Sequence, residues 1–239
     1  MKKIVAILAV IFITLSSFNY VFNEQVINDP NITVRNISTG FNAISVSGAV
    51  NVYLTQDKDM AMAVSASKPE YIDNIVTEVK NNTLYISSKG FVKGNSPNYR
   101  IYLSVDKLDK IASSGASDIY FKGTFKQSDL DISLSGASDI SGEVKIDNLK
   151  LSGSGSSDFK LSGYAENLKL TISGASDIKG YTLSCKNANI VASGASDVKL
   201  TVHGEVSAVA SGASDIKIKG TANVTNSTST GASSIKKVS

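Results

Sequence analysis

The chain has 239 residues, of which 42% are hydrophobic and 19% are charged, and its formal net charge is +3. This balance excludes intrinsic disorder, which needs low hydrophobicity and a high net charge, and it argues against a nucleic-acid-binding protein. Three prolines, no tryptophan and many Ser, Gly, Thr, Val and Ile residues favour an all-β protein with repeated turns. The length allows one large domain or two small ones.

A short positive segment followed by an apolar run opens the chain. Two lysines precede the unbroken apolar stretch Ile4–Ile13, and the polar cluster Thr14–Ser17 follows it. This order is typical of a secretory signal peptide, and the stretch is shorter than the roughly 20 residues of a membrane-spanning helix. We therefore expect residues 1–24 to be a signal peptide and the mature chain to be exported, with no membrane span, to the periplasm, the outer surface or the medium. An uncleaved N-terminal anchor is the alternative.

Residues 33–109 contain short alternating segments without a fixed repeat. We predict a short helix that begins within Pro69–Asn74 and a loop at Ser88–Asn98. Five strands are predicted: Ala43–Val46, Val50–Leu54, Met60–Val64, Thr83–Ile86 and Tyr99–Val105. Because repeat folds need atypical ends to cover their exposed edges, we interpret this region as a β-rich N-terminal cap. The segment Ser47–Val52 (S-G-A-V-N-V) is a degenerate first copy of the motif described next.

The motif S-G-A-S-D-I recurs through residues 110–239. Its copies place glycine at Gly115, Gly136, Gly155, Gly174, Gly194, Gly212 and Gly231. The separations are 21, 19, 19, 20, 18 and 19 residues, which is too short for a helical pair or a propeller blade and falls in the range of solenoid turns. We predict a parallel β-helix (β-solenoid) of about 19 residues per turn, continuous with the cap. It should be right-handed, because crossovers between parallel strands are right-handed in about 98% of cases.

Each copy of the motif follows an alternating apolar stretch, such as Leu168, Leu170 and Ile172. Period-two alternation indicates a strand with one buried face. If the chain stays extended through the motif, the glycine and the second serine point inward, whereas the alanine and the aspartate point outward.

The aspartates of successive copies should form a column on the outside of the solenoid. They are Asp118, Asp139, Asp158, Asp177, Asp197 and Asp215. Like charges stacked about 4.8 Å apart repel each other. A lysine follows four of these aspartates by two residues, at Lys160, Lys179, Lys199 and Lys217. We therefore expect a basic column beside the acidic one.

Three segments together resemble a known family. They are F-N-A-I-S-V-S-G-A-V-N-V-Y-L at Phe41–Leu54, L-Y-I-S at Leu84–Ser87, and the repeated S-G-A-S-D-I. The chain resembles, from Val34 to Ile235, the putative autotransporter adhesin head GIN domain family of Bacteroidetes. The resemblance implies a right-handed parallel β-helix-like fold, export and an adhesin-like role. It supplies no catalytic or binding residues. The last copy departs from the pattern, because Ser234 stands in place of the aspartate.

Metal and catalytic sites are weakly indicated. The aspartate column is a weak calcium candidate, because other Gly- and Asp-rich solenoid repeats bind this ion; turn-stabilising aspartates paired with lysine are the alternative reading. We expect no cofactor. The single His203 has no nucleophile motif beside it, and the single Cys185 is interpreted as a small filler.

The polar, repetitive exterior predicts a non-enzymatic, adhesin-like or structural binding module, with a surface glycan or a surface protein as its partner. An envelope enzyme that acts on polysaccharide is the alternative, because carboxylate pairs could come from the aspartate column. Homo-oligomers could form through the solenoid ends, where the polar stretch Asn223–Thr230 closes the series.

Overall fold

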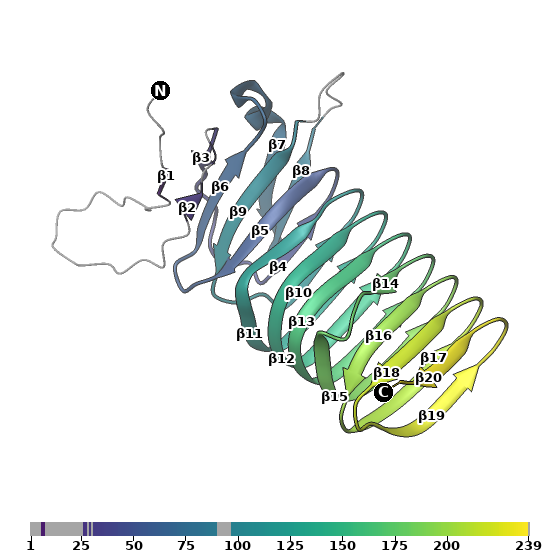
Figure 1. The fold of residues 1–239 in the computed structure, drawn as a ribbon. Coiled ribbons are helices and arrows are strands. Elements are labelled where there is room, and N and C mark those ends of the chain that lie inside the picture. Colours follow the sequence, from purple (N-terminus) through teal and green to yellow (C-terminus); the bar gives the residue numbers. More distant parts are fainter. Residues whose placement is uncertain (1–5, 8–25, 28, 30, 90–96, 239) are drawn as a thin grey trace.

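The computed structural model describes residues 6–7, 26–27, 29, 31–89 and 97–238. Coils stack along one axis toward the C-terminus, and a group of strands and one short helix closes the N-terminal end (Figure 1). The predicted signal peptide lies outside the described residues except for Ala6–Ile7 (β1), which pairs antiparallel with Val26–Ile27 (β2).

The elements follow the sequence patterns closely. The cap contains β3 (Thr33–Val34), β4 (Ala43–Val46), β5 (Val50–Gln56), β6 (Ala61–Ser65), the 3₁₀-helix η1 (Pro69–Asn74), β7 (Ile75–Lys80), β8 (Thr83–Ser88), β9 (Tyr99–Val105) and β10 (Lys110–Ser113). The coils contain β11 (Ile119–Leu134), β12 (Asp139–Gly153), β13 (Asp158–Ile172), β14 (Asp177–Ile178), β15 (Leu183–Ala192), β16 (Asp197–Val202), β17 (Glu205–Ala210), β18 (Asp215–Lys219), β19 (Asn223–Ser229) and β20 (Ser234–Lys237). The five predicted strands form, whereas β7 was not predicted.

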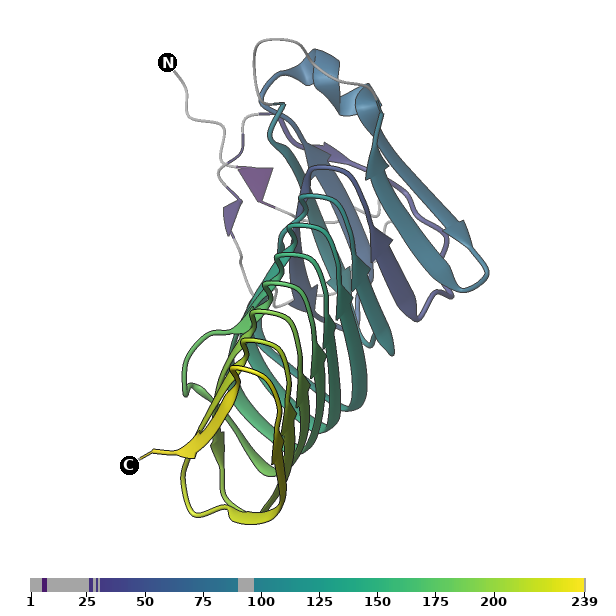
Figure 2. The same cartoon turned by 90° about the vertical axis from the view of Figure 1, so that its right-hand side faces the viewer.

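Two parallel ladders run along the stack, one on each side of the core (Figure 2). The first ladder has the order β9–β5, then the starts of β11, β12 and β13, then β14–β16–β18–β20. The second has the order β8–β4–β10, then the ends of β11, β12 and β13, then β15–β17–β19. Antiparallel partners end both ladders in the cap, where β6 pairs with β9 and β7 pairs with β8.

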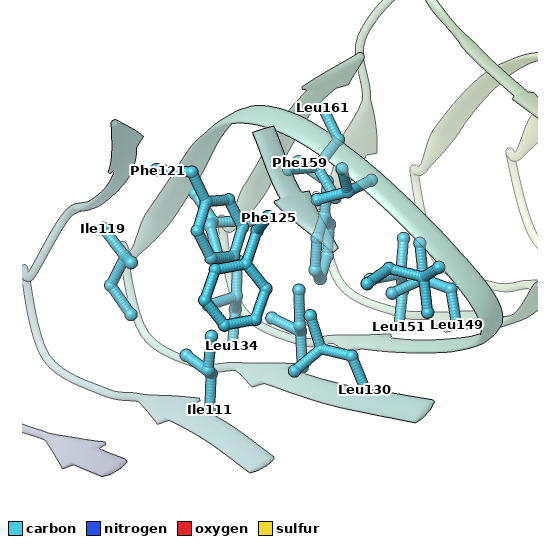
Figure 3. Close-up of a cluster of buried hydrophobic side chains, with 14 of the residues drawn as sticks. Ile111, Ile119, Phe121, Phe125, Leu130, Leu134, Leu149, Leu151, Phe159 and Leu161 are labelled. Carbon is cyan, nitrogen blue, oxygen red and sulfur yellow. The ribbon is translucent and has the colours of Figure 1, made fainter. Parts of the chain in front are cut away.

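Alternating apolar side chains from both ladders fill the space between them. Leu168, Leu170 and Ile172 are buried, as the period-two pattern predicts. Two aromatic rings add bulk to the first full coils: Phe121 and Phe125 stack with ring centroids 5.1 Å apart, close to Ile111 and Leu134 (Figure 3). This continuous apolar interior is the main source of the stability of the stack.

The S-G-A-S turns lie directly on one another along one edge. In each turn the alanine or serine after the glycine donates its N–H to the glycine carbonyl of the preceding coil, for example Ser156 to Gly136 at 2.7 Å. A Cβ on Gly155 would lie 2.5 Å from that same carbonyl oxygen. The degenerate copy takes part as well, because Ala116 donates to Gly48 at 2.7 Å. The glycines therefore form one column, as the repeat predicts.

The predicted direction of the glycines was wrong. Gly155 lies at an exposed corner with φ +77°, a conformation in which the chain is no longer extended, so the count of alternate positions does not carry through it. Two residues later the count holds again: in the six copies before the last, the second serine is fully buried and the aspartate that follows points outward.

Candidate functional site

The outward side chains of the two ladders form two different polar faces. We call the outer side of the second ladder the asparagine face and the outer side of the first ladder the aspartate face. Each face consists of columns in which the same position recurs in successive coils, because the strands are parallel and in register.

An amide ladder runs along the asparagine face. Asn187 donates a side-chain N–H to the Asn167 carbonyl at 3.0 Å, and Asn167 donates in the same way to Asn148 at 3.0 Å. The ladder continues at both ends: Asn148 donates to the Asp129 carboxylate at 2.9 Å, and the Glu205 backbone N–H donates to Asn187 at 3.1 Å. These bonds hold the three amides in one orientation, in a ladder that extends over five coils.

A shallow groove of about 420 Å³ follows this ladder. Its lining comes from β12, β13, β15, β17 and β19, so it crosses the coils along the stack. Beside the asparagines it contains Lys150, Lys169 and Asn189. Lys150 is engaged with Asp131 at 2.6 Å.

A second groove of about 450 Å³ lies on the same face, nearer the S-G-A-S corner. Hydroxyl side chains dominate its lining, including Ser133, Ser152 and Thr171, which occupy one column. The asparagine face therefore offers amides in one groove and hydroxyls in the other, both in rows along the stack.

On the aspartate face the acidic column and the lysines neutralise each other in the middle coils. Lys160 bonds to Asp139 of the preceding coil at 2.5 Å and lies 3.7 Å from Asp158 of its own coil. Lys179 repeats this arrangement with Asp158 and Asp177. Hydrogen bonds to the aspartates raise the pKa of both lysines above the ordinary value, although burial opposes the shift.

The aspartates also stabilise the backbone. Asp139 Oδ1 accepts the N–H of Asp158 at 3.2 Å, and Asp177 Oδ1 accepts that of Asp197 at 2.9 Å. These contacts agree with the interpretation that the aspartates of the column stabilise the turns. In the described part of the chain no group of three or more His, Cys, Asp or Glu side chains could hold a metal ion, so the geometry gives the calcium hypothesis no support.

Three tyrosines continue the aspartate face into the cap. Tyr53 stacks on Tyr102 on one side and on Tyr120 on the other, with ring centroids 5.2 and 5.0 Å apart. The Lys122 ammonium lies 4.9 Å from the Tyr53 ring centre. Burial raises the pKa of Tyr120 to about 12, and the Asp118 carboxylate adds to the shift.

The remaining candidates lie apart from these faces. Cys185 is buried in the core, where burial raises the pKa of its thiol to about 12, which matches its interpretation as a filler. His203 is exposed at a bend before β17.

The sequence carries a signal for the amide ladder. Asn148, Asn167 and Asn187 recur with the period of the motif, and equal spacing in a solenoid places them in one column. The tyrosine stack has no comparable signal, because its members come from β9, β5 and β11, which are neighbours in space but not in chain order.

The fold and its faces define a class: an all-β parallel solenoid with repeated polar columns along its outer faces. The sequence matches, over residues 40–222, the family described as putative auto-transporter adhesin, head GIN domain. The chain belongs to this family. None of the curated proteins matches it. In the described residues no helix has the length and apolar character to span a membrane.

Two solved structures show the same fold. A putative adhesin from Bacteroides fragilis is 24% identical, with a TM-score of 0.79, and the match covers 88% of this chain and 98% of the other. A putative lipid binding protein from Parabacteroides distasonis is 19% identical, with a TM-score of 0.62, and the match again covers 88% and 98%. At these identities the comparison establishes architecture alone.

Proposed function

We propose that this protein is an exported, non-enzymatic adhesion module that binds a linear glycan along the amide groove of the asparagine face. The observation that carries the proposal is the ladder Asn148–Asn167–Asn187, which aligns identical amides along an open groove. The membership of an adhesin family supports the general role.

The amides keep hydrogen-bonding capacity for a ligand. An asparagine side chain has two N–H donors and an oxygen with two lone pairs. Within the ladder Asn167 uses one N–H donor and one oxygen lone pair. Its second N–H and its second lone pair stay available on an exposed side chain. A sugar hydroxyl both donates and accepts, so each amide can meet a hydroxyl with complementary groups.

Repetition supplies the affinity. The residues that line the amide groove include no aromatic side chain, so sugar rings have no platform on which to stack. Each coil then contributes weakly, and a polymer that engages several coils at once gains by effective concentration. The proposal therefore names an extended polysaccharide rather than a short oligosaccharide.

Glycan-array binding with the mature chain tests this function. We expect linear polysaccharides to be retained while their monosaccharides are not. Asn189→Ala removes a groove side chain outside the ladder, and Asn167→Ala removes a ladder amide; both should weaken binding about tenfold, the loss of roughly 1.4 kcal/mol of contacts. Asn51→Ala, on the aspartate face, should leave it unchanged.

Three outcomes would oppose the proposal. Binding that survives both groove variants would place the site elsewhere, and an absence of binding to any polysaccharide would favour a protein partner. Cleavage of the bound polysaccharide, seen as new chain ends, would favour the enzyme alternative. The thermal midpoint of each variant shows whether a loss of binding reflects unfolding.

Export is part of the proposal, and its support is the apolar N-terminal stretch together with the adhesin family. Fractionation of the native host with surface labelling would locate the protein. Recovery in the cytoplasm at full length would contradict the proposed role. Self-association through Asn223–Thr230 stays a prediction.

A further inference from the structure

The aspartate face changes character toward the C-terminal end. There Lys199, Lys217 and Lys236 occupy one column, as the register of β16, β18 and β20 shows. Lys219 lies two residues further along β18. Parallel strands are about 4.8 Å apart, so the three column lysines form a row of closely spaced positive charges.

Carboxylates do not balance this row as they do in the middle coils. Among the described residues, the ion pairs of the column end at Lys179, which contacts Asp158 and Asp177. The acidic column itself ends at Asp215, because Ser234 takes the aspartate position of the last coil and donates its hydroxyl to Asp215 at 2.5 Å. From residue 197 onward the sequence has five lysines and three acidic residues, Asp197, Glu205 and Asp215.

Glu205 does not compensate on this face. It belongs to β17, in the second ladder, and lines the amide groove on the opposite side of the core. The three lysines therefore face solvent. The carboxylates in the column beside them are Asp197 and Asp215. Like charges in register destabilise a sheet, and an anionic ligand would relieve that repulsion.

We propose that the row Lys199–Lys217–Lys236 binds a linear polysaccharide that carries sulfate or carboxylate groups, with its chain along the stack axis. The site lies on the face opposite the amide groove and does not depend on the function proposed above. One ammonium per coil matches a ligand with a single file of anionic groups.

The shape of the charge pattern favours this ligand over other polyanions. The row is one residue wide, and a flat anionic membrane would meet the column of Asp197 and Asp215 as well. Proteins that bind single-stranded nucleic acid place aromatic side chains where bases stack. The aromatic residue close to the row is Tyr181, and the Lys219 ammonium lies over its ring, 4.8 Å from the centroid.

Salt-dependent binding to dextran sulfate, with uncharged dextran as the reference, tests the proposal on the mature chain. We expect dextran sulfate to bind and dextran not to bind. The logarithm of the binding constant should fall linearly with the logarithm of salt concentration, because ligand binding releases counterions. In the triple variant K199Q/K217Q/K236Q the affinity should fall at least about tenfold, and the slope should decrease by about 2 if each contact contributes roughly 0.7.

A matched control separates a site from general charge. The triple variant K58Q/K80Q/K126Q removes the same charge from exposed positions elsewhere and should retain the affinity and the slope. Equal losses in the two triple variants would overturn the proposal, as would equal binding of dextran. Circular dichroism and the thermal midpoint report whether each variant is folded, and Lys217→Gln alone should still give a partial loss.

Two further probes test the ligand class. Single-stranded oligonucleotides and vesicles that contain phosphatidylserine should bind more weakly than dextran sulfate at equal ionic strength. If either binds as tightly through the same three lysines, the assignment to a polysaccharide is wrong. Because the amide groove is unchanged in these variants, failure here leaves the glycan proposal for the asparagine face standing.

Discussion

The cap and the coils are held together in different ways. In the coils one contact is made many times: the N–H that follows each motif glycine reaches the glycine carbonyl of the preceding coil, at 2.7 or 2.8 Å throughout. The contacts of the cap, in contrast, are not repeated from one strand to the next. Asp29, for example, is buried and accepts hydrogen bonds from Arg100 at 2.9 Å and from Tyr102 at 3.1 Å.

This difference determines how each region responds to change. A residue in a coil touches its own equivalents above and below, so a substitution disturbs two neighbouring turns at once. A residue in the cap has partners of other types, and its role depends on charge and hydrogen bonding rather than on repetition. The substitutions below compare the two regions.

The largest difference is expected between two glycines. Both Gly155 in the coils and Gly40 in the cap have positive φ, +77° and +101°. A Cβ on Gly155 would lie 2.5 Å from the Gly136 oxygen, whereas a Cβ on Gly40 has nothing within 4 Å. Gly155→Ala should lower the free energy of unfolding by about 2 to 5 kcal/mol, from backbone strain and overpacking together, and Gly40→Ala by about 1 to 2 kcal/mol from strain alone.

Urea unfolding of the two alanine variants gives this comparison directly. Because the same residue is introduced at positive φ in both, Gly40→Ala is the control for strain. Equal losses of unfolding free energy would mean that the stacked turns can move apart at little cost. The close stacking would then not be the reason why this position requires glycine.

The coils could be predicted further than the cap for the same reason. A period near 19 residues reveals the solenoid, the buried serines and the aspartate column without any knowledge of long-range pairing. Whether the glycines point inward or outward could not be predicted by counting alternate positions, because a residue at positive φ interrupts the extended chain. In the cap, β9 lies between β5 and β6, and no pattern in residues 57–98 predicts this order.

The lysine–aspartate contacts add a detail that the predicted columns left open. We expected a basic column beside the acidic one, without a specific partner for each lysine. The structure pairs Lys160 more closely with Asp139, 21 residues away, at 2.5 Å than with Asp158 at 3.7 Å. Lys160 lies opposite Ser141 in the register, so Asp139 is its diagonal neighbour and the backbone positions do not favour it over Asp158. The lysine side chain extends toward the preceding coil, which the spacing of residues along the sequence does not predict.

The charge of Asp29 gives the cap a pH dependence. Burial disfavours the carboxylate, but hydrogen bonds outweigh it, so the pKa of Asp29 lies below its ordinary value. The donors are the Asn31 backbone N–H at 3.2 Å, Arg100 at 2.9 Å and Tyr102 at 3.1 Å. A lowered folded pKa adds stability above the unfolded pKa of about 3.9, and this stability is lost as the pH falls through the folded value.

Asp29→Asn should therefore lower the free energy of unfolding at pH 7 by about 1.5 to 3 kcal/mol, the contribution of hydrogen bonds to a charged group. Below about pH 4 the difference from the parent chain should begin to shrink, because the unfolded parent is protonated first and the folded parent only as the pH passes its lowered pKa. Urea unfolding at pH 7 and at pH 3 measures both differences. A difference that is the same at both pH values would show that the charge of Asp29 contributes nothing.

The smallest expected effect lies within the coils and tests how strictly they repeat. The buried serines Ser157 and Ser138 occupy equivalent positions, but only Ser157 has a hydroxyl partner among the described residues, the Ser154 carbonyl at 3.0 Å. Ser157→Ala should lower the free energy of unfolding by about 1 kcal/mol, whereas Ser138→Ala should be close to neutral, because it removes a buried hydroxyl that forms no bond. The two variants are controls for each other, since both serines are fully buried at the same position of the motif. Equal losses would mean that the hydroxyls behave alike in solution, and that the coils repeat in their hydrogen bonds as closely as in their backbone.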